Sequence, residues 1–218
     1  MAVQITNGAF FNDWLMKKTG FQCVSFNEAM MSGPVSECIF DEVFVCQRAQ
    51  YHHVSKEDYL NAMKPFLDVM DYLEQVDELV LWFGTDAFCQ MNLLTIYHLL
   101  KKNNYKGVVK TVLFDENEPW DAALSQKPQV TNWEAMSELY QKVLVEKNSV
   151  HCDDEIMNHA IELYLDLIDE NGRLNRWIRQ YPVMDEMRLV KMLMSVSKEE
   201  GLSDIQALEM IRKVREIK

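Results

Sequence analysis

The segment over residues 79–102 constrains the fold more than any other, because a buried strand runs into a helix through a single glycine. Residues 79–83 form an unbroken apolar run, which is typical of a strand covered on both faces. The helix expected from Asp86 to Lys102 is apolar nearly all round. Polar residues gather at its start: Asp86, Gln90 and Asn92. This pattern favours an α/β protein with a site at the end of the strand.

Three more strands are predicted, over residues 3–6, 21–26 and 107–114, the last from its β-branched residues. Helices are expected between them, over residues 10–18, 39–53 and 56–75. Ser55 should cap the third of these, and Pro65 predicts a kink or break near Lys64. Strands that alternate with helices favour parallel pairing.

The pattern changes after residue 119, where no further strand signal appears. Helices are predicted over residues 131–147, 153–169, 173–180, 185–197 and 203–217. A capping box, Thr131-Asn132-Trp133-Glu134, should begin the first of them. We therefore expect an α/β domain over residues 1–130, with a mostly parallel four-stranded sheet and flanking helices. An all-helical domain or appendage should follow over residues 131–218 and pack on it.

Composition indicates a soluble cytoplasmic chain, because 48% of the 218 residues are hydrophobic but no apolar run is long enough to span a membrane. The first residues also lack the pattern of a signal peptide. Five cysteines without a Cys-x-x-Cys pair favour reduced, buried and inert thiols. Cys89 could be more acidic, since it lies in the first turn of a helix, but its apolar neighbours favour burial.

The whole chain has a formal net charge of −12, which is unevenly distributed along the sequence. Residues 1–170 carry 12 basic and 27 acidic side chains, whereas residues 171–218 carry 10 and 7. The acidic part should repel nucleic acid and anionic membranes, so neither is expected as a partner. The basic residues near the C-terminus alternate with glutamates, which favours a salt-bridged helix surface over a DNA-binding unit.

Polar residues follow all four predicted strands, and parallel strands bring their carboxyl ends to one edge. The four sets are Asn7-Gly8, Asn27-Glu28, Gly84-Thr85-Asp86 with Gln90, and Asp115-Glu116. A phosphate site is disfavoured, because the turn has one glycine and Asp86 would place its own charge at the helix N-terminus. The edge should instead bind a polar neutral or cationic ligand, or a metal such as Mg²⁺ through carboxylates. No metal-ligand set and no cofactor are assigned.

Each of these side chains also has a purely structural interpretation. Asp86 could be only a helix first-turn acid, and Gln90 could hold the neighbouring loop by a hydrogen bond. Arg48 is better read as a solvated helix residue, unless its helix packs over the strand ends and pairs it with Asp86 or Glu28. The His151, Glu155 and His159 set spans too long a helix to bind one metal ion, so a surface Glu155/His159 pair is favoured.

Four segments occur in a characteristic order: Asn7-Gly8, residues 26–35 from Phe-Asn-Glu to Ser-Gly-Pro-Val, the Arg48-Ala49 pair with Tyr51, and residues 81–90, Leu-Trp-Phe-Gly-Thr-Asp-Ala-Phe-Cys-Gln. Together they resemble the bacterial domain-of-unknown-function 1835 family. The resemblance covers about residues 1–116, and Ala9 stands where that family usually has Asp. It implies an α/β architecture with a shared polar site but supplies no reaction.

Two functional hypotheses follow. In the first, the α/β part binds a small polar ligand, with or without catalysis, through Asn7, Gly8, Asn27, Glu28, Arg48, Gly84, Asp86 and Gln90. In the second, the protein is a regulatory or scaffolding protein whose helical half is the interaction surface, with Met30-Met31 and residues 184–194 as adaptable apolar contacts. The sequence does not determine the oligomeric state, and it is compatible with a homo-oligomer.

Overall fold

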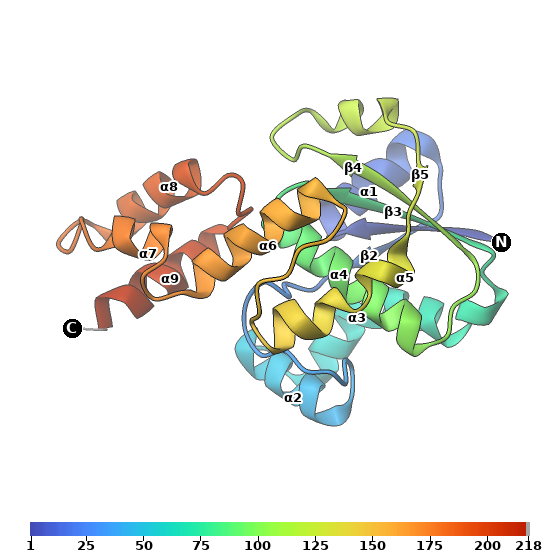
Figure 1. Cartoon of the computed structure of the whole chain (residues 1–218), viewed down its shortest axis with the longest axis horizontal. Coiled ribbons are helices and arrows are strands. Elements are labelled where there is room, and N and C mark those ends of the chain that lie inside the picture. The colour runs from blue at the N-terminus through green and yellow to red at the C-terminus, as the bar shows by residue number, and fades with distance from the viewer. Residues whose placement is uncertain (217–218) are drawn as a thin grey trace.

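The computed structural model describes residues 1–216 and has an α/β fold with a helical C-terminal half (Figure 1). One sheet has the strand order β2-β1-β3-β4-β5. Its parallel strands are β1 (Ala2–Asn7), β2 (Cys23–Phe26), β3 (Glu78–Gly84) and β4 (Val108–Phe114). The predicted fold class is confirmed, but the sheet has a fifth strand, β5 (Gln129–Val130), which pairs antiparallel with β4. A two-residue edge strand is too short to produce an alternating pattern.

The strand order sets where a site can form. The chain passes from β1 to β2 on one side and then crosses back to β3 on the other side of β1. In open α/β sheets, ligands commonly bind at such a reversal, outside the carboxyl ends of the two strands that flank it, here β1 and β3. Asn7 ends β1 and Gly84 ends β3, so both residues lie at this reversal of the strand order.

Helices cover both faces of the sheet, as the apolar run at residues 79–83 predicts (Figure 1). Leu79, Leu81 and Phe83 point into the main core, whereas Val80 and Trp82 pack in a second cluster on the opposite face. That second cluster contains residues of α1 (Ala9–Thr19) and of a 3₁₀-helix (Trp120–Ser125). The main core includes residues of α2 (Glu42–Tyr51), α3 (Lys56–Asp71) and α4 (Ala87–Lys102).

Helix α3 runs without interruption through Pro65, so of the kink or break predicted near Lys64, the break does not occur. Its buried residues are Tyr59, Met63, Phe66 and Val69, which stand on one face, and this packing compensates for the backbone hydrogen bond that proline cannot make. Ser55 caps the helix as predicted, because its side chain accepts a hydrogen bond from the Asp58 amide. The helix ends earlier than expected, and a 3₁₀ turn (Leu73–Gln75) follows it.

The helical half begins irregularly. Thr131 bonds Thr111 of β4 at 2.7 Å, and Asn132, the N-cap residue of α5, makes no side-chain cap, so the predicted capping box is wrong. Helix α5 (Trp133–Met136) is short and is followed by a π-helical segment (Gln141–Val145). The remaining helices are close to prediction: α6 (Glu155–Ile168), α7 (Arg173–Ile178), α8 (Glu186–Val196) and α9 (Asp204–Glu216). The predicted end of the last helix at residue 217 lies outside the described residues.

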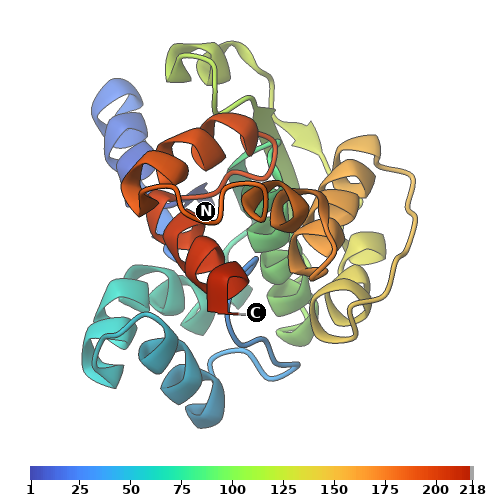
Figure 2. The ribbon, with the colours of Figure 1, turned by 90° about the vertical axis from the view of Figure 1, so that its left-hand side faces the viewer.

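Helices α8 and α9 lie in front of the sheet when the molecule is viewed from its C-terminal half (Figure 2). Side-chain bonds fix α9 to the first half, since Tyr51 donates to Glu209 at 2.9 Å and Gln206 donates to Ser32 at 2.8 Å. Arg212 pairs with Glu186 at 3.0 Å, as expected of a salt-bridged helix surface. Over residues 1–216, no helix has the length and apolar character needed to cross a bilayer.

Two burial predictions need correction. All five cysteines are free, but Cys38 is exposed and only Cys89 is fully buried, so the expectation of uniformly buried thiols is wrong. Met30 and Met31 are buried in the core and cannot serve as an exposed contact surface.

Candidate functional site

The carboxyl ends of β1, β3 and β4 bring a group of polar residues together at one edge of the sheet. Asp86 follows β3 and caps α4, with its Oδ1 atom accepting a hydrogen bond of 2.9 Å from the Cys89 amide. Asp86 and Cys89 are about one helical turn apart. The same cap therefore also directs the Cys89 side chain toward the strand ends. Glu116 reaches the same place from the loop after β4.

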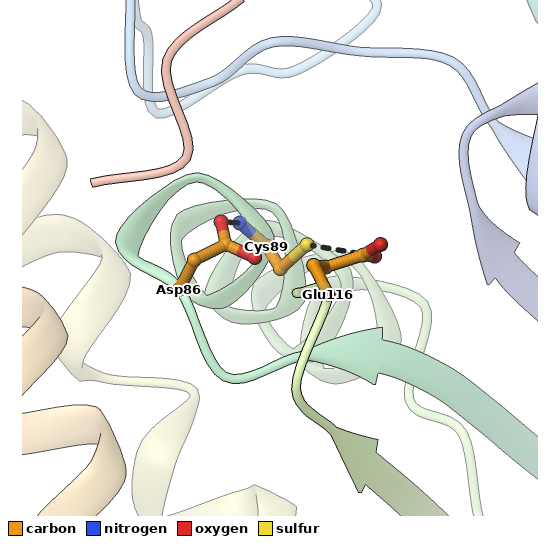
Figure 3. A group of neighbouring side chains, drawn as sticks. All are labelled: Asp86, Cys89 and Glu116. Atoms are coloured by element: carbon orange, nitrogen blue, oxygen red, sulfur yellow. Dashed lines mark hydrogen bonds between the residues drawn. The ribbon is translucent and has the colours of Figure 1, made fainter. Parts of the chain in front are cut away.

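Asp86, Cys89 and Glu116 form a compact cluster, in which the sulfur lies between the two carboxyl groups (Figure 3). One ligand-type atom from each of the three residues lies within 4.8 Å of the others. The Cys89 thiol faces Glu116 Oε1 at 3.7 Å. Asp86 and Cys89 are buried, whereas Glu116 is partly exposed.

Asn7 holds the cysteine sulfur from the side of β1. Its Nδ2 atom donates to Cys89 Sγ at 2.9 Å, and its Oδ1 atom accepts from Asn92 Nδ2 at 2.8 Å. Asn92 is itself oriented by the Met30 amide, which donates to its Oδ1 atom at 2.9 Å. A chain of amide hydrogen bonds therefore fixes which end of the Asn7 side chain faces the sulfur.

The cluster favours the protonated form of each of its acids. Burial raises the pKa of Asp86 and outweighs the hydrogen bonds that the carboxylate accepts. Burial and the charges of Asp86 and Glu116 raise the pKa of the Cys89 thiol well above its usual range. Burial and the neighbouring Asp86 charge also raise the pKa of Glu116. Cys89 is buried, as its apolar neighbours predict, and this burial outweighs the helix dipole that could lower the pKa of an exposed thiol.

The N-terminus of α4 is closed by the C-terminal half. The amides of Ala87 and Phe88 donate to the backbone carbonyls of Glu199 (2.8 Å) and Glu200 (3.1 Å). Gly201 packs directly on Asp86, since a methyl group added at Gly201 would overlap Asp86 Oδ1. These contacts use the first helix amides, which agrees with the prediction that the turn does not bind phosphate.

A cavity of about 310 Å³ adjoins Asp86 where the two halves of the chain meet. Polar and charged residues dominate its lining, which consists of Thr85, Asp86, Asp115, Asn117, Glu155, Ile156, His159, Lys198 and Glu199. His159 lies 3.6 Å from Glu199, and both side chains are exposed. The interpretation of His159 as a surface residue is therefore supported. Its acidic neighbour is Glu199, whereas the sequence predicts Glu155, and His159 and Glu199 both line the cavity.

Glu28 and Arg48 form a separate ion pair in the interior, and both side chains are 0% exposed. Tyr59 donates to Glu28 at 2.6 Å, and Arg48 Nη1 donates to the Pro34 carbonyl at 3.2 Å. The interpretation of Arg48 as a solvated residue is wrong. Helix α2 packs with this side chain in the interior, where it donates hydrogen bonds to carbonyls of the loop after β2. The pairing with Glu28 is the alternative that the sequence left open.

The other predicted site residues have distinct positions. Gly84 lies at the base of the Asp86 cluster, and Gln90 is buried and donates to the Gly84 carbonyl at 2.6 Å, as its structural interpretation predicts. Gly8 begins α1 with a positive φ of 80°. Asn27 is exposed and donates to the Ala62 carbonyl at 3.0 Å, away from the cluster.

Cys89 and Glu116 belong to the cluster, but the sequence does not single them out as ligand-binding residues. The spacing of Asp86 and Cys89, three residues apart at a helix start, places both at the strand ends and is the signal that could identify the cysteine. Glu116 is predicted only as a strand-end acid. The contributions of His159 and Lys198 to the cavity depend on the packing of the helical half, which the sequence does not specify.

No family model matches the chain, and no curated protein matches it. Among solved structures, it is similar to a DNA primase domain from Pseudomonas aeruginosa, with 12% sequence identity and a TM-score of 0.35. The match covers 97% of this chain, which spans about half (54%) of the length of the primase-domain chain. A likeness at this level carries no argument about function.

Proposed function

We propose that this protein binds a small polar ligand, neutral or cationic, in the cavity at the C-terminal edge of the sheet. The observation that carries the proposal is the position of this cavity. It lies beside Asp86 at the strand ends, between the α/β part and the helical half. Ligands of open α/β sheets bind outside the carboxyl ends of the strands, and clefts between structural units are common binding places.

The charge of the lining supports a neutral or cationic ligand. Besides the buried Asp86, three carboxylates, those of Asp115, Glu155 and Glu199, line the cavity together with a single lysine, Lys198. An anion would be repelled by this excess of negative charge. It would also find the first amides of α4 already bonded to backbone carbonyls of the C-terminal half.

The resemblance of residues 1–116 to the domain-of-unknown-function 1835 family forms part of this proposal. A catalytic role is not assigned. The alternative of an interaction surface on the helical half is supported only by single exposed apolar side chains, among them Met187 (58% exposed) and Ile205 (67% exposed).

A thermal-shift screen tests the proposal with amines, amides and polyols, compared with carboxylates and phosphates of similar size. We expect ligands from the first group to raise Tm. Asp86→Asn and Glu155→Gln should each abolish that rise. Asparagine is as good an N-cap as aspartate, so Asp86→Asn should leave Tm without ligand nearly unchanged.

Asp185→Asn is the matched control, because Asp185 caps α8 in the same way but does not line the cavity. It should retain the full ligand response. Stabilisation by anions alone, or a response that survives both cavity substitutions, would show that the proposal is wrong.

A further inference from the structure

Asp86, Cys89 and Glu116 provide three potential metal ligands at one point of the strand-end edge (Figure 3). We propose that they bind a divalent transition-metal ion of the zinc or ferrous class. The inference goes beyond the ligand cavity, because Cys89 and Glu116 do not belong to the lining of that cavity. Asp86 is the one residue that the two sites share.

The Asp86 carboxylate gives the first independent indication of a bound ion. The residue is only 8% exposed, and its Oδ2 atom is buried without a hydrogen-bond partner, whereas Oδ1 accepts the hydrogen bond of the helix cap. A buried carboxylate oxygen without a partner is energetically costly. A cation bound to Oδ2 would remove that cost without disturbing the cap.

The space above Gly84 shows where Oδ2 points. A methyl group added at Gly84 would lie 2.6 Å from Asp86 Oδ2 and 2.9 Å from Cys89 Sγ. It would also lie 2.5 Å from Glu116 Cγ. The three side chains therefore converge over the glycine, and only a residue without Cβ leaves room for them to do so.

The local charge balance supports a cation. None of the ion pairs found within residues 1–216 involves Asp86, Cys89 or Glu116, so no lysine or arginine neutralises the cluster. The Asn7 amide donates a hydrogen bond to the sulfur and holds it beside the carboxyl group of Glu116. On binding, the thiol proton passes to solvent and the metal keeps its oxidation state.

The ligand types determine the class of metal. Thiolate sulfur is a soft ligand that Zn²⁺ and similar ions accept, whereas Mg²⁺ and Ca²⁺ require oxygen ligands. The Mg²⁺ expectation from the sequence considered carboxylates alone, whereas the thiol in this cluster favours a softer ion. Three protein ligands leave a fourth position open in tetrahedral zinc sites. Since Asp86 also lines the cavity, the ion would lie at the wall of the space proposed for the polar ligand.

Titration of the whole, metal-free chain with Co²⁺ tests the inference without any organic ligand. We expect one Co²⁺ per chain and a thiolate-to-cobalt charge-transfer absorption. Cys89→Ser should abolish this absorption, and Glu116→Gln should weaken Co²⁺ binding at least about tenfold, which is the loss seen even for residues that only support metal ligands. Cys152→Ser is the control, because Cys152 is partly buried and, like Cys89, close to acidic residues, but it lies outside the cluster.

Absence of the absorption in the unchanged protein would overturn the inference, and so would its persistence in Cys89→Ser or its loss in Cys152→Ser. Circular dichroism verifies that each variant is folded. If Cys89→Ser does not fold, Glu116→Gln decides, because Glu116 is partly exposed and unchanged Co²⁺ affinity in that variant would contradict the site. Retained Co²⁺ binding together with loss of the ligand response in Glu155→Gln separates this site from the cavity.

Discussion

Asn7 Nδ2 lies 2.9 Å from Cys89 Sγ, so one hydrogen bond joins the end of β1 to the first turn of α4 across 82 residues of sequence. The other end of the same amide accepts from Asn92, which is 0% exposed. Asn7 is therefore a link between two buried groups. Its loss should affect stability as well as the cluster.

Asn7→Ala should lower the free energy of unfolding by about 1–3 kcal/mol, because a buried amide hydrogen of Asn92 loses its acceptor. Urea denaturation measures the loss. Asn27→Ala is the control, since Asn27 is exposed and its removal breaks only a hydrogen bond to the Ala62 carbonyl. Equal losses in the two variants would contradict the buried link.

Glu28→Gln should destabilise the protein by about 3–5 kcal/mol, because it leaves the Arg48 charge buried without its partner. Glu186→Gln removes an ion pair between partly exposed side chains, with Arg212, and should cost less than about 1 kcal/mol. Chemical denaturation of both variants at neutral pH compares the two pairs. A small loss for Glu28→Gln would mean that solvent reaches Arg48.

Acid should weaken the folded state through Glu28. Burial alone raises its pKa, but hydrogen bonds from His52, Arg48 and Tyr59 and the Arg48 charge outweigh it and lower the pKa from 4.5 to about 2. A lowered pKa contributes stability that is complete above the unfolded value and is lost as pH falls through the folded value. The window is therefore between about 4.5 and 2, with a contribution on the order of 3 kcal/mol.

Unfolding free energies measured between neutral pH and pH of about 2 test this expectation. The unchanged protein should lose stability more steeply than Glu28→Gln across the acid window. Parallel curves for the two proteins would assign the acid sensitivity to other carboxyl groups.

Gly201→Ala should destabilise the contact between the two halves of the chain. Gly201 has a φ of +69°, and an added methyl group would overlap Asp86 Oδ1. Gly20→Ala isolates the backbone contribution, because Gly20 has a φ of +74° with nothing within 4 Å of the added methyl group. The strain from a positive φ should cost about 1–2 kcal/mol in both variants. Thermal unfolding should show the larger loss for Gly201→Ala, and equal losses would contradict the close packing on Asp86.

Much of the fold could be predicted because local patterns determine it. The apolar run at residues 79–83 predicts β3 with both faces covered, and Ser55 predicts the start of α3. Local patterns fail where tertiary contacts compete with them. Thr131 bonds Thr111 instead of capping a helix, and the buried face of α3 holds that helix together through Pro65.

The candidate site could be predicted only in part, for a related reason. Parallel pairing makes strand ends converge, so the order of strands and helices in the sequence is enough to place Asn7 and Asp86 at one edge. Strand pairing does not determine which side chains turn into the interior. The sequence therefore could not show that Glu28 and Arg48 form a buried ion pair away from that edge. The part that Glu199 and Gly201 play at α4 could not be foreseen, because they belong to a distant segment without a pattern of its own.

Two backbone carbonyls accept hydrogen bonds from the first amides of α4, and this affects how the chain folds during its synthesis on the ribosome. Helix α4 ends at Lys102, and its first amides are bonded by Glu199 and Glu200. At elongation rates of about 5–20 residues per second, roughly 5–20 s pass between the synthesis of the end of α4 and the synthesis of those partners. During that interval the helix amides are open to water and to any anion in the cell, and the closed edge is acquired only once the helical half has been translated.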